Sequence, residues 1–266
     1  MKRRPDRCLV VSVTTVPWRI RFLDSVLHNL LAQSFNDFEL HVYIPYRCQR
    51  SAEPYELPAS LLALERSESR LQLRRLATDY GPATKLLGPF LEHQDAQTSG
   101  DASLITVDDD VELERHAIEE LVEATARYPE DALGFMGVSE NQYIHAETLA
   151  AHGLADFTPS ILGGYRAVLY PLRSLDASLL EDYDGVTDRC QPFLDDDHLI
   201  AWNLSRRGIT RRVIATRYPG RDFGLNFQFL NLPGPITSGE DGGPGVLRSH
   251  RRLIDYYRDN GWAFPR

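Results

Sequence analysis

The sequence predicts an α/β protein in which helices flank a doubly wound, mostly parallel but mixed central sheet, built as a single domain. Two observations predict this fold. Short apolar strands alternate with helical segments at a regular pace through the first half, which implies right-handed crossovers. The 266 residues, of which 42% are hydrophobic, can bury one large core, although two small domains would also fit this length.

The first half of the chain reads as successive strand–helix units. Residues 8–14 are apolar on both faces, as in a central parallel strand, and residues 22–31 place apolar pairs at helical spacing. The same reasoning predicts the remaining elements of this half: strands at 38–44, 71–76 and 103–107, and a short helix near 60–66.

The second half is less regular. A helix is expected over 114–128 and a strand over 132–138, whereas 139–159 carries no clear pattern and could determine acceptor specificity. The other predicted elements are a strand pair or turn at 161–170, a helix that ends at Gly208, a long loop at 218–245 that could close over a ligand, and a final helix at 247–260.

Composition excludes several classes of protein. A formal net charge of −9 argues against a nucleic-acid binder, and no apolar run has the length of a membrane span or a signal peptide. The three cysteines lack Cys-x-x-Cys spacing, so they suggest neither a disulfide framework nor a zinc site, and the cytoplasm is the expected location. The basic first residues are compatible with peripheral contact to an anionic membrane, although a solvated terminus is the simpler interpretation.

Three consecutive aspartates close the predicted strand at 103–107. Side chains alternate along an extended chain, so Asp108 and Asp110 should point one way and Asp109 the other. Carboxylates this close repel one another unless a cation lies between them, and Mg²⁺ or Mn²⁺ bound to phosphate oxygens is the natural partner. The alternative is that one aspartate caps the helix that follows and the others are solvated.

A lysine and a glycine pair are further candidates. Lys85 opens a helix after a Gly-Pro turn, a poor place for a cation in the helix dipole, so it is either a pyrophosphate ligand or simply solvated. Gly163 and Gly164 either let the backbone approach a ligand closely or permit a bulge.

A second acidic cluster begins another helix. Asp195 suits the N-cap position, and Gly208 suits the position after the C-cap. One cap needs one carboxylate, so Asp196 and Asp197 remain without a structural role.

These motifs resemble those of the GT-A nucleotide-sugar glycosyltransferases, most closely the bacterial members of the family-2 kind. The resemblance covers most of residues 8–216, and Asp196 departs from it because glutamate is commoner there. The family places Leu seven and Gly eleven residues after its base, which selects Asp197. Its motifs correspond to Thr14-Thr15 with Arg19, to Val107–Asp110 as the DxD metal motif, to Asp196-Asp197, and to His250.

The resemblance implies a metal-dependent glycosyltransferase. It would move a sugar from a nucleotide-diphosphate sugar to a glycan or lipid-linked glycan, with inversion, in bacterial surface polysaccharide synthesis. Asp110, Asp108 and His250 would hold Mn²⁺ or Mg²⁺, and Asp197 would be the catalytic base with Asp196 beside it.

The resemblance also divides the chain into a donor-binding half (8–112), an acceptor and catalytic half (113–216) and an irregular tail (217–266). Asp79 would bind the nucleobase, and Arg19 and Lys85 the phosphates. The other expected donor contacts are Thr14, Thr15, Asp108 and Asp109, and the expected acceptor contacts are Gly163, Gly164 and Tyr165.

Two other functions remain open at the level of sequence. A sugar-1-phosphate nucleotidyltransferase has a similar sheet but usually carries a glycine-rich basic loop after its first strand, unlike Thr14-Thr-Val-Pro-Trp18. A non-catalytic glycan-binding domain of the same fold would leave both aspartate clusters unused.

Overall fold

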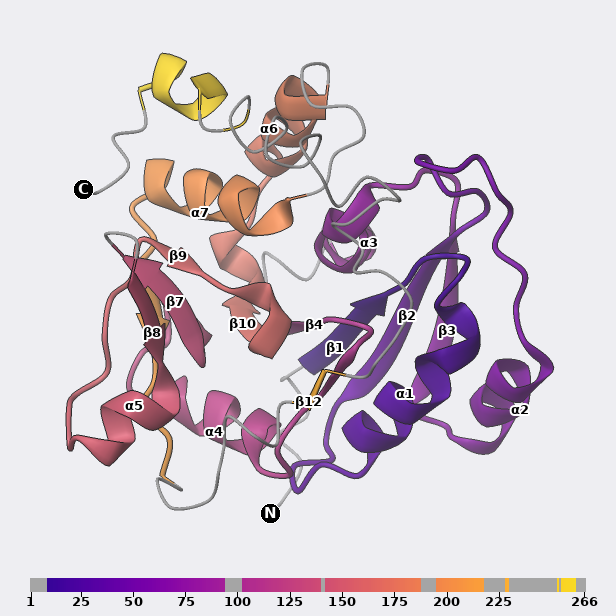
Figure 1. The fold of residues 1–266 in the computed structure, drawn as a ribbon, viewed down its shortest axis with the longest axis horizontal. Helices are drawn as coiled ribbons and strands as arrows, with labels where there is room; N and C mark the ends of the chain where they lie inside the picture. The colour runs from indigo at the N-terminus through magenta and orange to yellow at the C-terminus, as the bar shows by residue number, and fades with distance from the viewer. Residues whose placement is uncertain are drawn as a thin grey trace.

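The computed structural model describes residues 9–93, 102–139, 142–187, 195–217, 228–229, 253 and 255–261. A seven-stranded mixed sheet forms its centre, as predicted (Figure 1). Its strands, in spatial order, are β11 (Arg211–Val213), β6 (Ala132–Gly134), β10 (Val168–Pro171), β4 (Ser103–Val107), β1 (Leu9–Thr14), β2 (Glu39–Pro45) and β3 (Leu71–Leu76).

The strand order reverses direction at the centre of this sheet. From β1 the chain adds β2 and then β3 on one side, and then returns to place β4 on the other side of β1. These four strands are parallel, and β10 is antiparallel to both of its neighbours. The carboxyl ends of β1 and β4 therefore form a topological switch point, where ligands of open α/β sheets bind.

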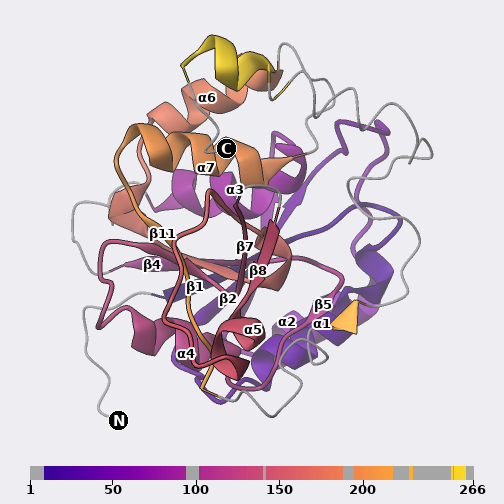
Figure 2. The same cartoon turned by 60° about the vertical axis from the view of Figure 1, so that its left-hand side comes forward.

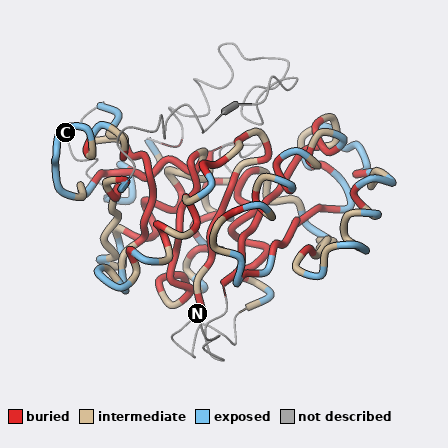
Figure 3. The backbone as a smooth tube through the Cα atoms, turned by 90° about the horizontal axis from the view of Figure 1, so that it is seen from below, coloured by how far each residue is buried: buried red, intermediate tan, exposed pale blue. Residues whose placement is uncertain are grey.

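Helices cover both faces of the sheet (Figure 2). The apolar residues of α1 (Leu23–Leu31) recur at helical spacing, which explains why Leu23, Val26, Leu27 and Leu30 are all buried. One face carries α3 (Thr84–Glu92) and α7 (Asp196–Arg206), with α6 (Ser178–Thr187) packed beside α7, and the opposite face carries α1 (Leu23–Leu31), α2 (Ala59–Ser67) and α4 (Ala117–Ala124). Figure 3 shows that the buried residues fill the middle of the molecule and that the exposed residues lie toward its periphery.

The strand predicted over 132–138 is in fact two strands. β6 ends at Gly134, and β7 (Met136–Ser139) joins a separate three-stranded antiparallel sheet with β8 (Gln142–His145) and β9 (Ile161–Leu162). The carbonyl of Phe135 accepts a hydrogen bond from Ala146 N instead of from a neighbouring strand, so the two halves pair with different partners. Residues 139–159 also contain α5 (Ala146–Ala151), which is too short for its periodicity to be visible in the sequence.

Other boundaries differ by a few residues. The helix expected over 114–128 spans only Ala117–Ala124. Of the predicted loop at 218–245, only β12 (Gln228–Phe229) is described, and it pairs antiparallel with β5 (Val111–Glu112), directly after the aspartate triplet. The rest of that loop, and much of the predicted final helix, lies outside the described residues. Within the described part of the chain, no helix has both the length and the hydropathy to cross a membrane.

Candidate active site

The candidate site begins at the switch point between β1 and β4. Val13 and Val107 are partners in the parallel register, so Thr15 and Asp109 each lie two residues beyond a paired position. The Thr15 hydroxyl donates a hydrogen bond of 2.6 Å to Asp109 Oδ2. The first predicted motif and the aspartate triplet are therefore brought together by strand pairing.

The exposure of the side chains alternates along the triplet, although residues 109 and 110 form a turn between β4 and β5 and are not extended. The Asp109 side chain is buried at 1% exposure, whereas those of Asp108 and Asp110 are 25% and 18% exposed. Burial raises the pKa of Asp109 to about 7, although Arg19 and the Thr15 hydroxyl act in the opposite direction. Asp109 is thus an inward-facing residue that anchors the triplet, and its two neighbours face the site.

Arg19 is buried against the triplet. Its guanidinium lies 3.2 Å from Asp109 Oδ1 and 2.6 Å from Asp110 Oδ2, with 2% of the side chain exposed. The structure therefore places Arg19 as a clamp on two aspartates. The phosphate contact expected of Arg19 remains a prediction.

Lys85 joins the two acidic clusters. Its ammonium is buried, 2.6 Å from Asp108 Oδ1 and 2.9 Å from Asp196 Oδ2. Burial alone would lower the pKa of Lys85, but the charges of Asp108, Asp196 and Asp197 outweigh burial and raise the pKa well above its usual value. Lys85 is therefore a permanent cation between the end of β4 and the start of α7, rather than a solvated residue.

The helix that carries the second cluster begins and ends as predicted. Asp195 is the N-cap of α7 and its Oδ1 accepts a hydrogen bond of 3.2 Å from His198 N. Gly208 adopts the left-handed conformation after the last turn, with φ of +69°. Asp196 and Asp197 follow the cap in the first turn and are free of that role.

Asp197 is held by the backbone of the glycine pair. Gly164 N donates a hydrogen bond of 2.9 Å to Asp197 Oδ1. A Cβ at Gly164 would lie 2.7 Å from that oxygen, and a Cβ at Gly163 would lie 2.0 Å from Met136 Cε. The glycines are therefore required by close approach to protein atoms. Contact with an acceptor by Gly163, Gly164 or the half-buried Tyr165 remains a prediction.

Both carboxyls of the α7 turn resist ionisation. Burial raises the pKa of Asp197 well above its usual value and the charge of Asp196 raises it further, whereas Lys85 lowers it. Burial likewise raises the pKa of Asp196, with Lys85 acting against it. A carboxyl whose pKa is raised is a stronger base once it is ionised.

Tyr170 is a residue of the site that the sequence did not identify. It lies in β10, is buried, and has its pKa raised well above the usual value by burial and then by the charges of Asp197 and Asp196. In the sequence it reads only as an apolar strand residue. Its position beside the carboxylates follows from the antiparallel insertion of β10 next to β4.

Two residues predicted to contact the donor, Asp79 and Thr14, form hydrogen bonds within the protein. Asp79 Oδ2 accepts from Gln49 N at 2.7 Å and its Oδ1 accepts from Gly81 N at 2.8 Å, which shapes the turn before Lys85. The Thr14 hydroxyl donates to the carbonyl of Tyr43 at 2.8 Å. Their contacts with a donor remain predictions, and His250 lies outside the described residues.

Two partly exposed aspartates at this site suit a divalent cation. Arg19 and Lys85 are the cations paired with its carboxylates, which are Asp108, Asp109, Asp110, Asp196 and Asp197. Asp108 and Asp110 each use one oxygen in these pairs and are partly exposed. Carboxylate oxygens are the ligands that Mg²⁺ and Mn²⁺ prefer, so Asp108 and Asp110 fit the expected metal.

Comparison with known proteins identifies the fold. No family model matches the chain, and no curated protein matches its sequence. Among solved structures it is similar to the crystal structure of S. aureus TarS 1-349 in complex with UDP-GlcNAc, with a TM-score of 0.52, 14% identity, and coverage of 94% of this chain and 66% of that chain. A second structure of S. aureus TarS 1-349 has a TM-score of 0.49 and 14% identity, with coverage of 96% and 74%. The chain therefore shares a fold with that segment of TarS and spans just under two thirds of its length.

Proposed function

We propose that this chain is a divalent-metal-dependent glycosyltransferase. It transfers a sugar from a nucleotide-diphosphate sugar to a hydroxyl of a glycan or lipid-linked glycan, with inversion at the anomeric carbon. The observation that carries the proposal is the meeting of two acidic clusters on Lys85 at the switch point of the sheet, where Asp108 and Asp196 lie 2.6 and 2.9 Å from its ammonium. The fold shared with TarS, whose structure holds UDP-GlcNAc, supports the same class of donor.

Each cluster has its own task in this proposal. Asp108 and Asp110 would hold Mn²⁺ or Mg²⁺, which when bound would supply positive charge for the leaving diphosphate. Lys85 adds a fixed positive charge beside them. Arg19 keeps Asp110 in position through its 2.6 Å contact.

The α7 turn supplies the base. Asp197 takes the proton from the acceptor hydroxyl as that oxygen attacks the anomeric carbon, and Gly164 N–H orients the carboxylate. A single displacement by the acceptor forms no covalent enzyme intermediate, so the configuration inverts. The segment of Gly163, Gly164 and Tyr165 lies next to this base and is the proposed acceptor side.

The setting we propose is bacterial surface polysaccharide synthesis, in the cytoplasm, with peripheral contact to the membrane. It rests on the family resemblance and on the basic first residues. This biological setting is independent of the proposed reaction, which is tested directly by measuring the nucleoside diphosphate that is released.

A sugar-nucleotide screen tests the chemistry. The full chain is incubated with UDP-, GDP-, ADP- and dTDP-sugars and Mn²⁺, with and without EDTA, and the released nucleoside diphosphate is measured. We expect one class of nucleotide to be released only when metal is present. Asp110→Asn should abolish both this release and metal-dependent donor binding, because Asp110 faces the site.

Matched controls separate the alternatives. Asp37→Asn, an exposed change before β2, should leave the release of nucleoside diphosphate unchanged.

Consumption of a nucleoside triphosphate and a sugar-1-phosphate would instead identify a nucleotidyltransferase. Metal-dependent binding of a sugar nucleotide without any turnover would favour a non-catalytic binding domain.

A further inference from the structure

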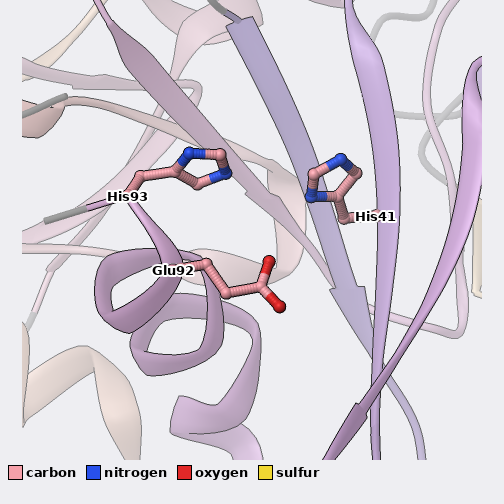
Figure 4. Close-up of side chains that lie close together, drawn as sticks. All are labelled: His41, Glu92 and His93. Atoms are coloured by element: carbon pink, nitrogen blue, oxygen red, sulfur yellow. The ribbon is translucent and has the colours of Figure 1, made fainter. Parts of the chain in front are cut away.

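Two histidines and a glutamate converge at the end of α3 opposite to Lys85. Glu92 and His93 lie at the carboxyl end of α3, and His41 lies in the amino-terminal half of β2. Their side chains point toward one another (Figure 4). Eight residues of helix separate Lys85 from His93, a rise of about 12 Å, so this cluster is distinct from the aspartate site.

Local geometry explains the convergence. Glu39, His41 and Tyr43 share one face of β2 because side chains alternate along a strand. Gly88 packs so closely on Tyr43 that a Cβ would lie 2.4 Å from its ring. Glu92 is four residues after Gly88, on the same face of the helix, so it is delivered to the same side of β2.

The three side chains offer ligand atoms at the spacing that a metal ion needs. One ligand atom from each of His41, Glu92 and His93 lies within 4.8 Å of the others. The two imidazole rings are stacked, with centroids 5.9 Å apart and an interplanar angle of 23°. Nε2 of His93 is buried and has no hydrogen-bond partner among the described residues.

Hydrogen bonding orients His41 as a ligand. Its Nε2 lies 3.0 Å from Glu39 Oε2, so this nitrogen carries the proton and the lone pair is on Nδ1. A carboxylate behind a histidine is the usual partner of a metal-binding imidazole.

The cluster holds fewer protons than its contacts require. The Tyr43 hydroxyl lies 3.1 Å from His41 Nδ1 and 2.8 Å from Glu92 Oε2, and its one proton can serve only one of them. A bound cation would satisfy lone pairs that face one another with no proton between them.

We propose that His41, Glu92 and His93 form a zinc site, with Glu39 orienting His41. Zn²⁺ binds imidazole nitrogen and carboxylate oxygen in tetrahedral geometry, with a fourth position available to water. Mg²⁺ and Mn²⁺ prefer oxygen ligands, so this site and the aspartate site select different metals. Bound zinc would fasten the end of α3 to β2 and stabilise the helix that carries Lys85.

The positive charge of Arg74 would weaken the binding of a zinc ion at this site. Its Nε lies 3.7 Å from Glu92 Oε2, and 39% of the side chain is exposed, so it can turn toward solvent when zinc binds. Arg74→Gln removes the competing positive charge. We therefore expect this variant to bind Zn²⁺ more tightly than the parent protein.

The test measures Zn²⁺ affinity of the full chain by competition with a chromophoric chelator, together with the change in melting temperature. We expect binding of one Zn²⁺ that Asp110→Asn retains. His93→Asn and Glu92→Gln should weaken it at least tenfold, and Glu39→Gln by about 10–100-fold, and the melting temperature of each variant without zinc shows whether it is folded. His152→Asn, an exposed change after α5, should not alter it.

Two results would overturn the zinc site. One is equal Zn²⁺ affinity for the parent protein, His93→Asn and Glu92→Gln. The other is loss of Zn²⁺ in Asp110→Asn but not in His93→Asn, which would assign the ion to the aspartate cluster. Neither result depends on transferase activity.

Discussion

The amide of Gly164 donates a 2.9 Å hydrogen bond to Asp197 Oδ1, and that oxygen lies 2.7 Å from where a Cβ of residue 164 would be. The contact joins the segment before β10 to the first turn of α7. It gives the proposed base one fixed orientation. A side chain at residue 164 cannot enter without displacing the carboxylate or the backbone.

Gly164→Ala should lower turnover by about 10-fold or more, because the methyl group moves Asp197 away from its position. Donor affinity should change little, since the metal-facing aspartates are untouched. The measurement is a double-mutant cycle of steady-state rates. Gly164→Ala combined with Asp197→Asn should be no slower than Asp197→Asn alone, and fully additive losses would show that residue 164 acts elsewhere.

Asp197→Asn should reduce turnover by about 10²–10⁴-fold, the usual loss when a general base is removed. Donor binding and melting temperature should barely move. Asp195→Asn should do the reverse, since it weakens the α7 cap at a cost of about 1 kcal/mol and leaves most turnover intact. An inactive Asp196→Asn beside an active Asp197→Asn would shift the base assignment by one residue.

Lys85→Gln should move the acidic limb of the pH–rate profile to higher pH. Lys85 lowers the pKa of Asp197 and Asp196, so its removal raises both, and the base is then lost at a higher pH as the pH falls. The quantity to compare is the pH at the midpoint of the acidic limb, because the maximal rate of the profile also depends on donor binding. Lys85→Arg keeps the charge and should keep the midpoint near that of the parent protein.

Asp109→Asn tests the protonation of the buried aspartate. The pKa of Asp109 rises from 3.8 to about 7 on folding, so the folded state holds this proton more tightly than the unfolded state. Its contribution to stability is therefore present at low pH and is lost as the pH rises from about 4 to about 7. The melting temperature of the parent protein minus that of Asp109→Asn should fall across this range, measured in EDTA. A difference that stays flat would mean that Arg19 keeps Asp109 ionised.

Asp110→Asn should make donor binding insensitive to metal. The carboxylate is partly exposed and faces the site, so its loss removes a ligand while the Arg19–Asp109 contact remains. The comparison is donor affinity with Mn²⁺ and with EDTA. Unchanged metal-dependent affinity in this variant would remove Asp110 from the metal site.

The elements that carry the site were largely predictable. β3 spans Leu71–Leu76 as expected, and Gly208 follows the C-cap of the helix behind Asp195 as expected. These predictions worked because period, caps and turn residues are local properties of the chain. The split of the predicted strand at Phe135 was not predictable, because a three-residue strand has no period of its own and its partner is chosen by distant segments.

The sequence by itself determined the α/β class, the position of Asp108–Asp110 at a strand end, and the cap that leaves Asp196 and Asp197 free. Only the tertiary structure decided which of these groups meet. Lys85 bridges Asp108 and Asp196, Gly164 holds Asp197, and Glu92 and His93 reach His41. Each of these contacts joins residues far apart in the chain, so it depends on strand order and helix packing, which the local pattern of residues does not encode.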